Sequence, residues 1–197
     1  MEKVLFATGN PAKIKRYVVG LAKRGIEAVT LKDLGIIANV EETGSTAIEN
    51  AIIKATEYHK RSGLTTIAID DCLFIEGLSD DEQPKDLVRR VNGKLLSDQE
   101  MIEHYSKIAT KLGGRANAYF LHGIAICKDN GTKTLESRQE RIFVDKPSPI
   151  LNEGYPLGSI NLVPKYNKYR VELTSEELEE LEQDDYKEIF DFIIDNV

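Results

Sequence analysis

The sequence predicts an α/β fold, with a sheet flanked by helices in a single domain over residues 1–197. Apolar and β-branched runs at Lys3–Thr8, Ile26–Leu31 and Thr65–Ile69 have the composition of buried strands. Helix-like segments lie between them, and this alternation is typical of an α/β core. At 197 residues and 41% hydrophobic content, the chain is long enough to bury one sizeable core. No linker rich in Pro, Gly or Ser and no repeat divides it.

The first helix is expected from Pro11 to about Arg24. Proline suits the first helical position, and apolar residues recur at helical spacing on one face. That face is formed by Ile14, Val18, Leu21 and Ala22. Gly25 is expected to end the helix, because glycine readily adopts the conformation that follows a helix terminus.

A capping box predicts the start of the second helix. Thr46 and Glu49 have the spacing at which the two side chains cap N–H groups at a helix start. The helix is expected to end near Gly63. Its core-facing residues are predicted to be Ala47, Ile48, Ala51, Ile52 and Ala55.

The middle of the chain is expected to be helical and polar. One helix is predicted near Pro84–Asn92. A second capping box, formed by Ser97 and Glu100, predicts a helix that reaches about Leu112.

A long hairpin is predicted next, followed by an irregular segment and an acidic end. The hairpin strands, roughly Arg115–Cys127 and Thr132–Val144, flank the DNG turn at Asp129–Gly131. The stretch KPSPILNEGYPLG is expected to be irregular because of its Pro and Gly content. Acidic helices with a solvated face are expected from about Ser175 to Ile194.

The composition excludes several classes of function. With 26 basic and 33 acidic side chains, the net charge of −7 argues against a broad nucleic-acid or membrane-binding surface, so a bound anion should be small. Two cysteines, Cys72 and Cys127, are too few for a disulfide framework, and the three histidines lack HExxH-like spacing. The amino terminus resembles neither a signal peptide nor a membrane span. These features predict a cytoplasmic protein without structural zinc.

A tight polar turn joins the first strand to the first helix, in the stretch VLFATGNPAKIKR. Gly9 permits close approach, Asn10 suits the N-cap, and free N–H groups would gather at the positive end of the helix. Lys13, one turn further on, adds a full positive charge. The turn is therefore a candidate phosphate site. The alternative is an ordinary capped turn with solvated lysines; it is not a Walker A loop, because GxxxxGK[ST] is absent.

Two acidic pairs are candidate metal ligands. Asp70 and Asp71 are expected at the carboxyl end of a core strand, where open α/β sheets bind ligands. Their side chains should point to opposite faces, so one would face the ligand while the other braces a loop or shares the metal. Glu41 and Glu42 precede the second helix, and carboxylates from separate segments suit Mg²⁺ when phosphates and water complete its coordination. A solvated turn is the alternative for the aspartate pair.

Asn50 and Lys54 form a third candidate feature. They are four residues apart on the second helix and so share a face, from which Lys54 could point at phosphates held by the first loop. The alternative is that both residues lie on the solvated side of an amphipathic helix.

Three motifs give the chain a specific resemblance over residues 4–78. The motifs ATGNPAK, EETGSTAIENAIIKA and AIDDCLFIEGL occur in the order and spacing of the Ham1-like inosine triphosphate pyrophosphatase family, which the chain resembles. The resemblance implies Mg²⁺-dependent hydrolysis of nucleoside triphosphates, especially ITP, dITP and XTP, to monophosphate and pyrophosphate. It also implies a homodimer, and an elongated mixed sheet flanked by helices, with two lobes around a nucleotide cleft.

The resemblance also implies roles for individual residues. Asp71 would be the catalytic residue that orients or deprotonates the attacking water, and Glu41 and Asp71 would serve Mg²⁺. Cys72 stands where the family usually has serine, and a thiol is the poorer hydrogen-bond partner. The remaining substrate-binding residues would be Thr8, Gly9, Asn10, Lys13, Asn50, Lys54, Gly154 and Tyr155.

The carboxyl-terminal half departs from the family pattern. The base-recognition loop, roughly GFGYDP, is represented only by EGYPLG, in which Gly154 and Tyr155 match. The later SHR signature and its preceding lysine are absent. Reading a deaminated purine requires placed donors and acceptors, whereas phosphate contacts are common to all nucleotides. Two alternatives therefore stay open: a related pyrophosphatase with another base preference, as in Maf-like proteins, or a nucleotide-binding regulatory protein that has lost turnover.

Overall fold

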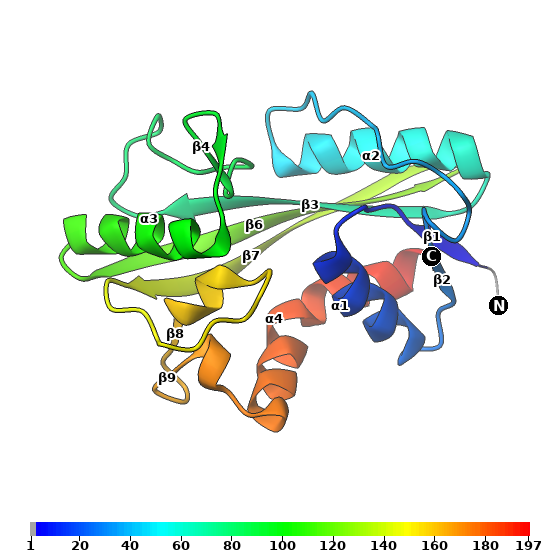
Figure 1. The fold of residues 1–197 in the computed structure, drawn as a ribbon. Helices are drawn as coiled ribbons and strands as arrows, with labels where there is room; N and C mark the ends of the chain where they lie inside the picture. The colour runs from blue at the N-terminus through cyan, green and yellow to red at the C-terminus, as the bar shows by residue number, and fades with distance from the viewer. Residues whose placement is uncertain (1–2) are drawn as a thin grey trace. The chain divides into compact units, whose positions relative to one another are not determined.

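The computed structural model describes residues 3–197 and contains a five-stranded sheet in the order β2-β1-β3-β6-β7 (Figure 1). Strand β1 pairs in parallel with both β2 and β3. Strands β6 and β7 are joined by two residues, as a hairpin requires, so the sheet is mixed. The strands are β1 (Val4–Phe6), β2 (Ala28–Thr30), β3 (Thr66–Ile75), β6 (Arg115–Lys128) and β7 (Gly131–Val144). The α/β fold and the long hairpin predicted from the sequence are confirmed.

Four α-helices accompany the sheet in the described residues. They are α1 (Pro11–Ala22), α2 (Ala47–Ser62), α3 (Asp98–Lys111) and α4 (Ser175–Asn196). Both predicted capping boxes are present, at Thr46 with Glu49 and at Ser97 with Glu100. The short elements are β4 (Arg90–Val91), β5 (Lys94–Leu95), β8 (Leu162–Val163), β9 (Lys168–Tyr169), and the 3-10 helices η1 (Pro156–Ser159) and η2 (Arg170–Glu172). No helix within residues 3–197 combines the length and apolar character needed to cross a membrane.

The chain divides into two compact units. The first contains the described residues up to Asp71, residues 122–137 and residues 186–197, and the second contains Cys72–Leu121 and Arg138–Asp185. The second unit has its own core around α3, where Met101, Tyr105 and Ala109 pack with residues such as Leu73 and Phe143. The residues predicted to bind phosphate belong to the first unit.

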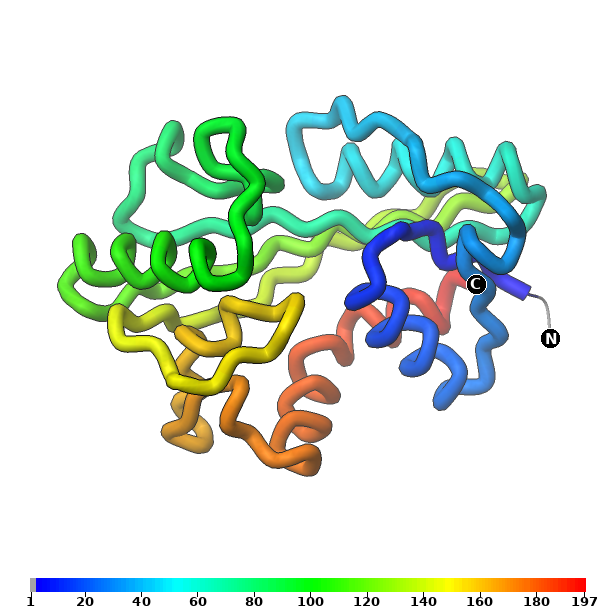
Figure 2. Tube along the Cα trace, viewed as in Figure 1, coloured from blue at the N-terminus to red at the C-terminus, as the bar shows by residue number. Residues whose placement is uncertain are grey.

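In the first unit, alternate residues of each strand face opposite layers of helix. On one face, Phe6, Ile69 and Ile124 pack with α1 and the end of α4. On the other face, Leu5, Ala68 and Ala125 pack with α2, which lies across the sheet from α1 (Figures 1 and 2). Because side chains alternate along a strand, this arrangement determines which helix each polar residue of β3 and β6 can reach.

Gly123 of β6 allows α2 to lie close to the sheet. A Cβ atom at this position would lie 2.3 Å from the Ile48 nitrogen and 2.4 Å from the Ala47 carbonyl carbon. Both atoms belong to the backbone of the first turn of α2, which therefore rests directly on the glycine. The contact sets the distance between the sheet and the helix that carries Asn50 and Lys54.

The helix predicted near Pro84–Asn92 is wrong. The segment forms turns and then the hairpin of β4 and β5, in which Arg90 pairs with Leu95 and Val91 with Lys94. Asn92 and Gly93 form the connecting turn with φ values of 50° and 78°. An Asn-Gly pair favours such a two-residue turn, and this local signal outweighs the polar, helix-like composition.

Three further expectations need correction. Strand β3 does not end at Asp70 and Asp71 but continues to Ile75, because the apolar residues that follow are buried and both aspartates have partners. Along α2, Ala47, Ala51 and Ala55 are buried as predicted, whereas Ile52 is exposed. The buried face instead includes Asn50, Lys54 and Tyr58. The acidic end forms the single helix α4 rather than several helices.

Candidate functional site

The loop between β1 and α1 is built around its own hydrogen bonds. The Asn10 side chain caps the helix, with Oδ1 accepting from the N–H groups of Ala12 at 2.9 Å and Lys13 at 3.4 Å. The Asn10 N–H donates to Thr8 Oγ1 at 3.1 Å. The predicted N-cap is confirmed, but two N–H groups expected to face an anion are bonded to Asn10 instead. The positive charge of the site therefore rests mainly on side chains.

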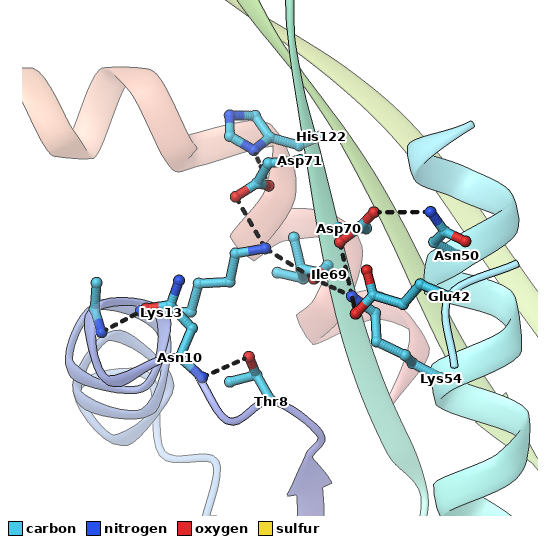
Figure 3. A network of polar contacts seen from close by, with 11 residues as sticks. Thr8, Asn10, Lys13, Glu42, Asn50, Lys54, Ile69, Asp70, Asp71 and His122 are labelled. Atoms are coloured by element: carbon cyan, nitrogen blue, oxygen red, sulfur yellow. Dashed lines mark hydrogen bonds and ion pairs between the residues drawn. The ribbon is translucent and has the colours of Figure 1, made fainter. Parts of the chain in front are cut away.

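Lys13 extends from α1 to β3. Its Nζ lies 2.9 Å from Asp71 Oδ2 and 3.0 Å from the Ile69 carbonyl oxygen. The side chain is only 13% exposed. The lysine is thus held in place by β3 rather than solvated, as Figure 3 shows.

Lys54 reaches the same strand from α2. Its Nζ lies 2.7 Å from Asp70 Oδ1, 3.2 Å from Glu42 Oε1 and 3.4 Å from the Ile69 carbonyl oxygen. Its side chain is 10% exposed, which contradicts the alternative of a solvated pair. Lys13 and Lys54 therefore share one backbone acceptor (Figure 3).

Asp70 and Asp71 point to opposite faces of β3, as the alternation of side chains predicted. Asp70 is 7% exposed, and besides Lys54 it accepts a hydrogen bond from Asn50 Nδ2 at 3.3 Å. Asn50 Oδ1 in turn accepts from the Gly44 N–H at 2.8 Å, which ties down the loop before α2. Asp70 therefore anchors α2 and its loop.

Asp71 has a different environment. Lys13 lies at its Oδ2, His122 Nδ1 lies 2.6 Å from its Oδ1, and its side chain is 27% exposed. Burial alone would raise the pKa of Asp71, but the charges of Lys13 and His122 and their hydrogen bonds outweigh it and hold the pKa well below its usual range. Asp71 is consequently an ionised and partly accessible carboxylate at neutral pH.

His122 is a site residue that sequence reasoning missed. It lies on β6, on the same face as Ile124 and Ile126, and is 4% exposed. Its ring centroid is 6.0 Å from that of Tyr186, over whose ring Arg16 lies at 4.5 Å. A histidine next to a glycine in an otherwise apolar strand was the only available signal.

The other predicted residues fall in three places. Glu41 is exposed, and it is Glu42 that contacts Lys54. Cys72 is buried directly after Asp71, at the start of the second unit. Gly154 and Tyr155 also belong to the second unit, where the Gly154 N–H donates to Asp98 Oδ2 at 2.7 Å.

The donor set fits a magnesium ion that arrives with a phosphorylated substrate. Across residues 3–197 no group of three or more His, Cys, Asp or Glu side chains is arranged to hold a metal. Mg²⁺, however, is commonly bound by one or two carboxylates together with phosphates and water. An ionised, partly exposed Asp71 would be suitable as one such ligand.

The fold and the contacts together define an α/β protein with a candidate site for a small polyanion, built from lysines of two helices and a carboxylate of the central strand. The chain belongs to the Ham1 family, whose model matches residues 4–183.

Individual relatives agree with the family assignment. The chain is 32% identical over 182 residues to a dITP/XTP pyrophosphatase of Bacillus subtilis, which covers 90% of this chain and 88% of the relative. It is also 32% identical over 183 residues to a dITP/XTP pyrophosphatase of Halalkalibacterium halodurans, with 92% of each chain covered. Among solved structures, the Ham1 protein of Coxiella burnetii matches with a TM-score of 0.79 at 25% identity, over 100% of both chains.

Proposed function

We propose that this protein hydrolyses nucleoside triphosphates, including non-canonical purines such as dITP, ITP and XTP, to the monophosphate and pyrophosphate. The names of its relatives support this reaction class. The observation that carries the proposal is the convergence of Lys13 and Lys54 on the Ile69 carbonyl oxygen, beside the ionised Asp71. Two ammonium groups near one acceptor repel each other, and a polyphosphate between them would relieve that repulsion.

Each residue then has a role that follows from its position. Lys13 and Lys54 bind phosphate oxygens and stabilise the charge that develops on the leaving pyrophosphate. Asp71 orients a water molecule and accepts its proton as the oxygen attacks the α-phosphorus. The bond from that phosphorus to the bridging oxygen breaks, and pyrophosphate leaves. Thr8, Gly9 and Asn10 would bind further phosphate oxygens, while Asp70 and Asn50 hold Lys54 and the loop in place.

Mg²⁺ is part of the proposal. Asp71 and the exposed Glu41 would hold it together with the substrate phosphates. When bound, it would supply charge neutralisation at the phosphates. We further infer that the protein is cytoplasmic and forms a homodimer. Size-exclusion chromatography with light scattering would test the oligomeric state. Because the family match spans both compact units, we infer that residues 1–197 act as one functional domain.

A panel of nucleoside triphosphates tests the reaction. The purified protein should release pyrophosphate and nucleoside monophosphate, and chelation of the divalent metal should reduce the rate by several orders of magnitude. Asp71→Asn should lower kcat about 100- to 10,000-fold in a folded sample. Asp129→Asn, whose side chain is fully exposed, is the matched control and should retain activity. Nucleoside diphosphate as the first product would overturn the proposed reaction.

A further inference from the structure

His122 is held against the carboxylate that the proposed reaction uses. Its Nδ1 lies 2.6 Å from Asp71 Oδ1, while Lys13 Nζ lies 2.9 Å from Asp71 Oδ2 (Figure 3). We propose that His122 is a positioning residue, which donates its Nδ1–H to Asp71 and thereby fixes the carboxylate in the orientation needed for attack by water. This inference rests on the proposed function, because it concerns how Asp71 is presented to the substrate.

The direction of the hydrogen bond follows from the chemistry of the partners. An ionised carboxylate has only acceptor oxygens, so a hydrogen bond with Asp71 requires the proton to be on Nδ1 of His122. Lys13 Nζ lies 2.9 Å from the other carboxylate oxygen, and this ion pair requires the charged form of Asp71. The contact therefore places a proton on Nδ1 of His122.

The imidazole has little room to turn away. The His122 side chain is 5% exposed, and its ring lies at 60° to that of Tyr186. The guanidinium of Arg16 in turn lies over the Tyr186 ring, 4.5 Å from its centroid. On the strand itself, the next residue is Gly123, against which the backbone of α2 packs. A rigid donor is what a positioning role requires.

Holding both carboxylate oxygens restricts rotation of the Asp71 side chain. Lys13 alone would fix one oxygen and leave the plane of the carboxylate free to turn. With His122 on the other oxygen, the lone pairs that remain point in fixed directions. Since the phosphates are bound by Lys13 and Lys54 rather than by His122, its loss should affect the chemical step much more than substrate binding.

Kinetics of three variants test the inference. His122→Ala should lower kcat about 10- to 100-fold while KM changes less than about twofold. His122→Asn, whose amide nitrogen can donate from nearly the position of Nδ1, should recover most of the loss. His59→Ala, which removes a histidine of the same unit outside the site, is the control and should retain wild-type kcat. A wild-type kcat for folded His122→Ala would overturn the inference.

A double variant separates positioning from general stabilisation. If His122 acts through Asp71, His122→Ala should add little to the loss already caused by Asp71→Asn. Multiplied losses would show that His122 acts elsewhere and would contradict the inference. Binding of a triphosphate with a non-hydrolysable α,β-bridge, measured by calorimetry, should be the same for the wild type and His122→Ala.

A measurement that does not require triphosphate hydrolysis can test the hydrogen bond of His122 separately from the proposed function. Nitrogen-15 correlation spectra should show a proton on Nδ1 of His122 in the wild type, and a changed Nδ1 signal in Asp71→Asn. If no triphosphate is hydrolysed, the proposed function fails while the hydrogen bond is still decided by these spectra. A proton on Nε2 with a bare Nδ1 would exclude His122 as the donor whatever the activity.

Discussion

Lys13 and Lys54 donate to the same oxygen atom, the carbonyl of Ile69, although they lie on helices that cover opposite faces of the sheet. Each also pairs with a different aspartate of β3, Asp71 and Asp70 respectively. The strand thus brings two positive charges together from opposite sides. In the proposed function, these two charges would bind the phosphates of the substrate.

Lys13→Ala should weaken binding of a non-hydrolysable nucleoside triphosphate by at least about tenfold, since it removes a charge-assisted contact of about 1.5–3 kcal/mol. The same ligand should raise the melting temperature of the wild type more than that of the variant, because binding to the native state stabilises it. Lys15→Ala, an exposed lysine of the same helix, should bind like the wild type. Calorimetry on all three proteins measures the difference, and equal affinities would exclude Lys13 from the phosphate site.

Asp70→Asn should destabilise the protein, by about 3–5 kcal/mol, because it leaves Lys54 as a buried charge without its main partner. The companion double variant Asp70→Asn with Lys54→Met should recover part of this loss. Urea unfolding measures the free energies. Removing the exposed pair of Glu57 and Lys60 should cost less than about 1 kcal/mol, which makes it a suitable comparison.

Asp71 should make stability depend on pH in the acid range. Its folded-state pKa lies below the unfolded value of about 3.9, so its contribution is present above that pH and is lost as the pH falls toward the folded-state pKa. The difference in unfolding free energy between the wild type and Asp71→Asn should therefore be constant near neutrality. Below about pH 4 the wild type should lose stability relative to the variant. Urea titrations from pH 6 to pH 3 follow this change. Parallel curves for the two proteins would show that the carboxylate is not stabilised by Lys13 and His122.

Gly123→Ala should destabilise the protein by about 1–3 kcal/mol or more, because the added Cβ would overlap backbone atoms of Ala47 and Ile48 that cannot move independently. Gly158→Ala, where a Cβ would meet the movable Val171 side chain at 2.9 Å, should cost less. Thermal unfolding compares the two variants. If Gly123→Ala retains its stability but loses triphosphate binding, the contact positions Lys54 rather than supporting the fold.

Selectivity among bases is expected to be modest. The sequence lacks the SHR signature and most of the loop that would read a deaminated purine, and each lost discriminating hydrogen bond removes about 1–3 kcal/mol of selectivity. Competition assays with paired triphosphates give the ratios of kcat/KM. A preference for ITP over ATP above about a thousandfold, equivalent to about 4 kcal/mol, would show that other residues have rebuilt the base pocket.

Local signals predicted much of this fold, and long-range pairings explain what was missed. Asn10 and Thr46 were predicted as caps because a cap is decided by residues two or three positions away. His122 lies 51 residues from Asp71, and no local pattern shows that the two share a face until the strands are aligned. The hairpin turn at Asn92 was the exception, a local signal that was read as part of a helix.

The same limit applies to the acidic residues before α2. Glu41 and Glu42 are adjacent and chemically equivalent in sequence, and only the path of the loop brings Glu42 to Lys54. That path depends on the hydrogen bond between Gly44 and Asn50, which depends in turn on the burial of Asn50. A chain of contacts of this kind is a property of tertiary structure, and neither composition nor spacing contains it.

The shared acceptor at Ile69 also affects how this site would appear in a mutational scan. The oxygen belongs to the main chain, so every amino acid at position 69 supplies it equally. Substitutions there would report only on the packing of a buried apolar side chain, and Val or Leu would be tolerated to the extent that the core allows. A genetic screen would therefore record position 69 as ordinary core while scoring Lys13 and Lys54 as unrelated hits on separate helices. Replacing side chains does not alter the carbonyl oxygen that both lysines contact. An amide-to-ester exchange of the Ile69–Asp70 linkage weakens that carbonyl as an acceptor and would therefore test its role.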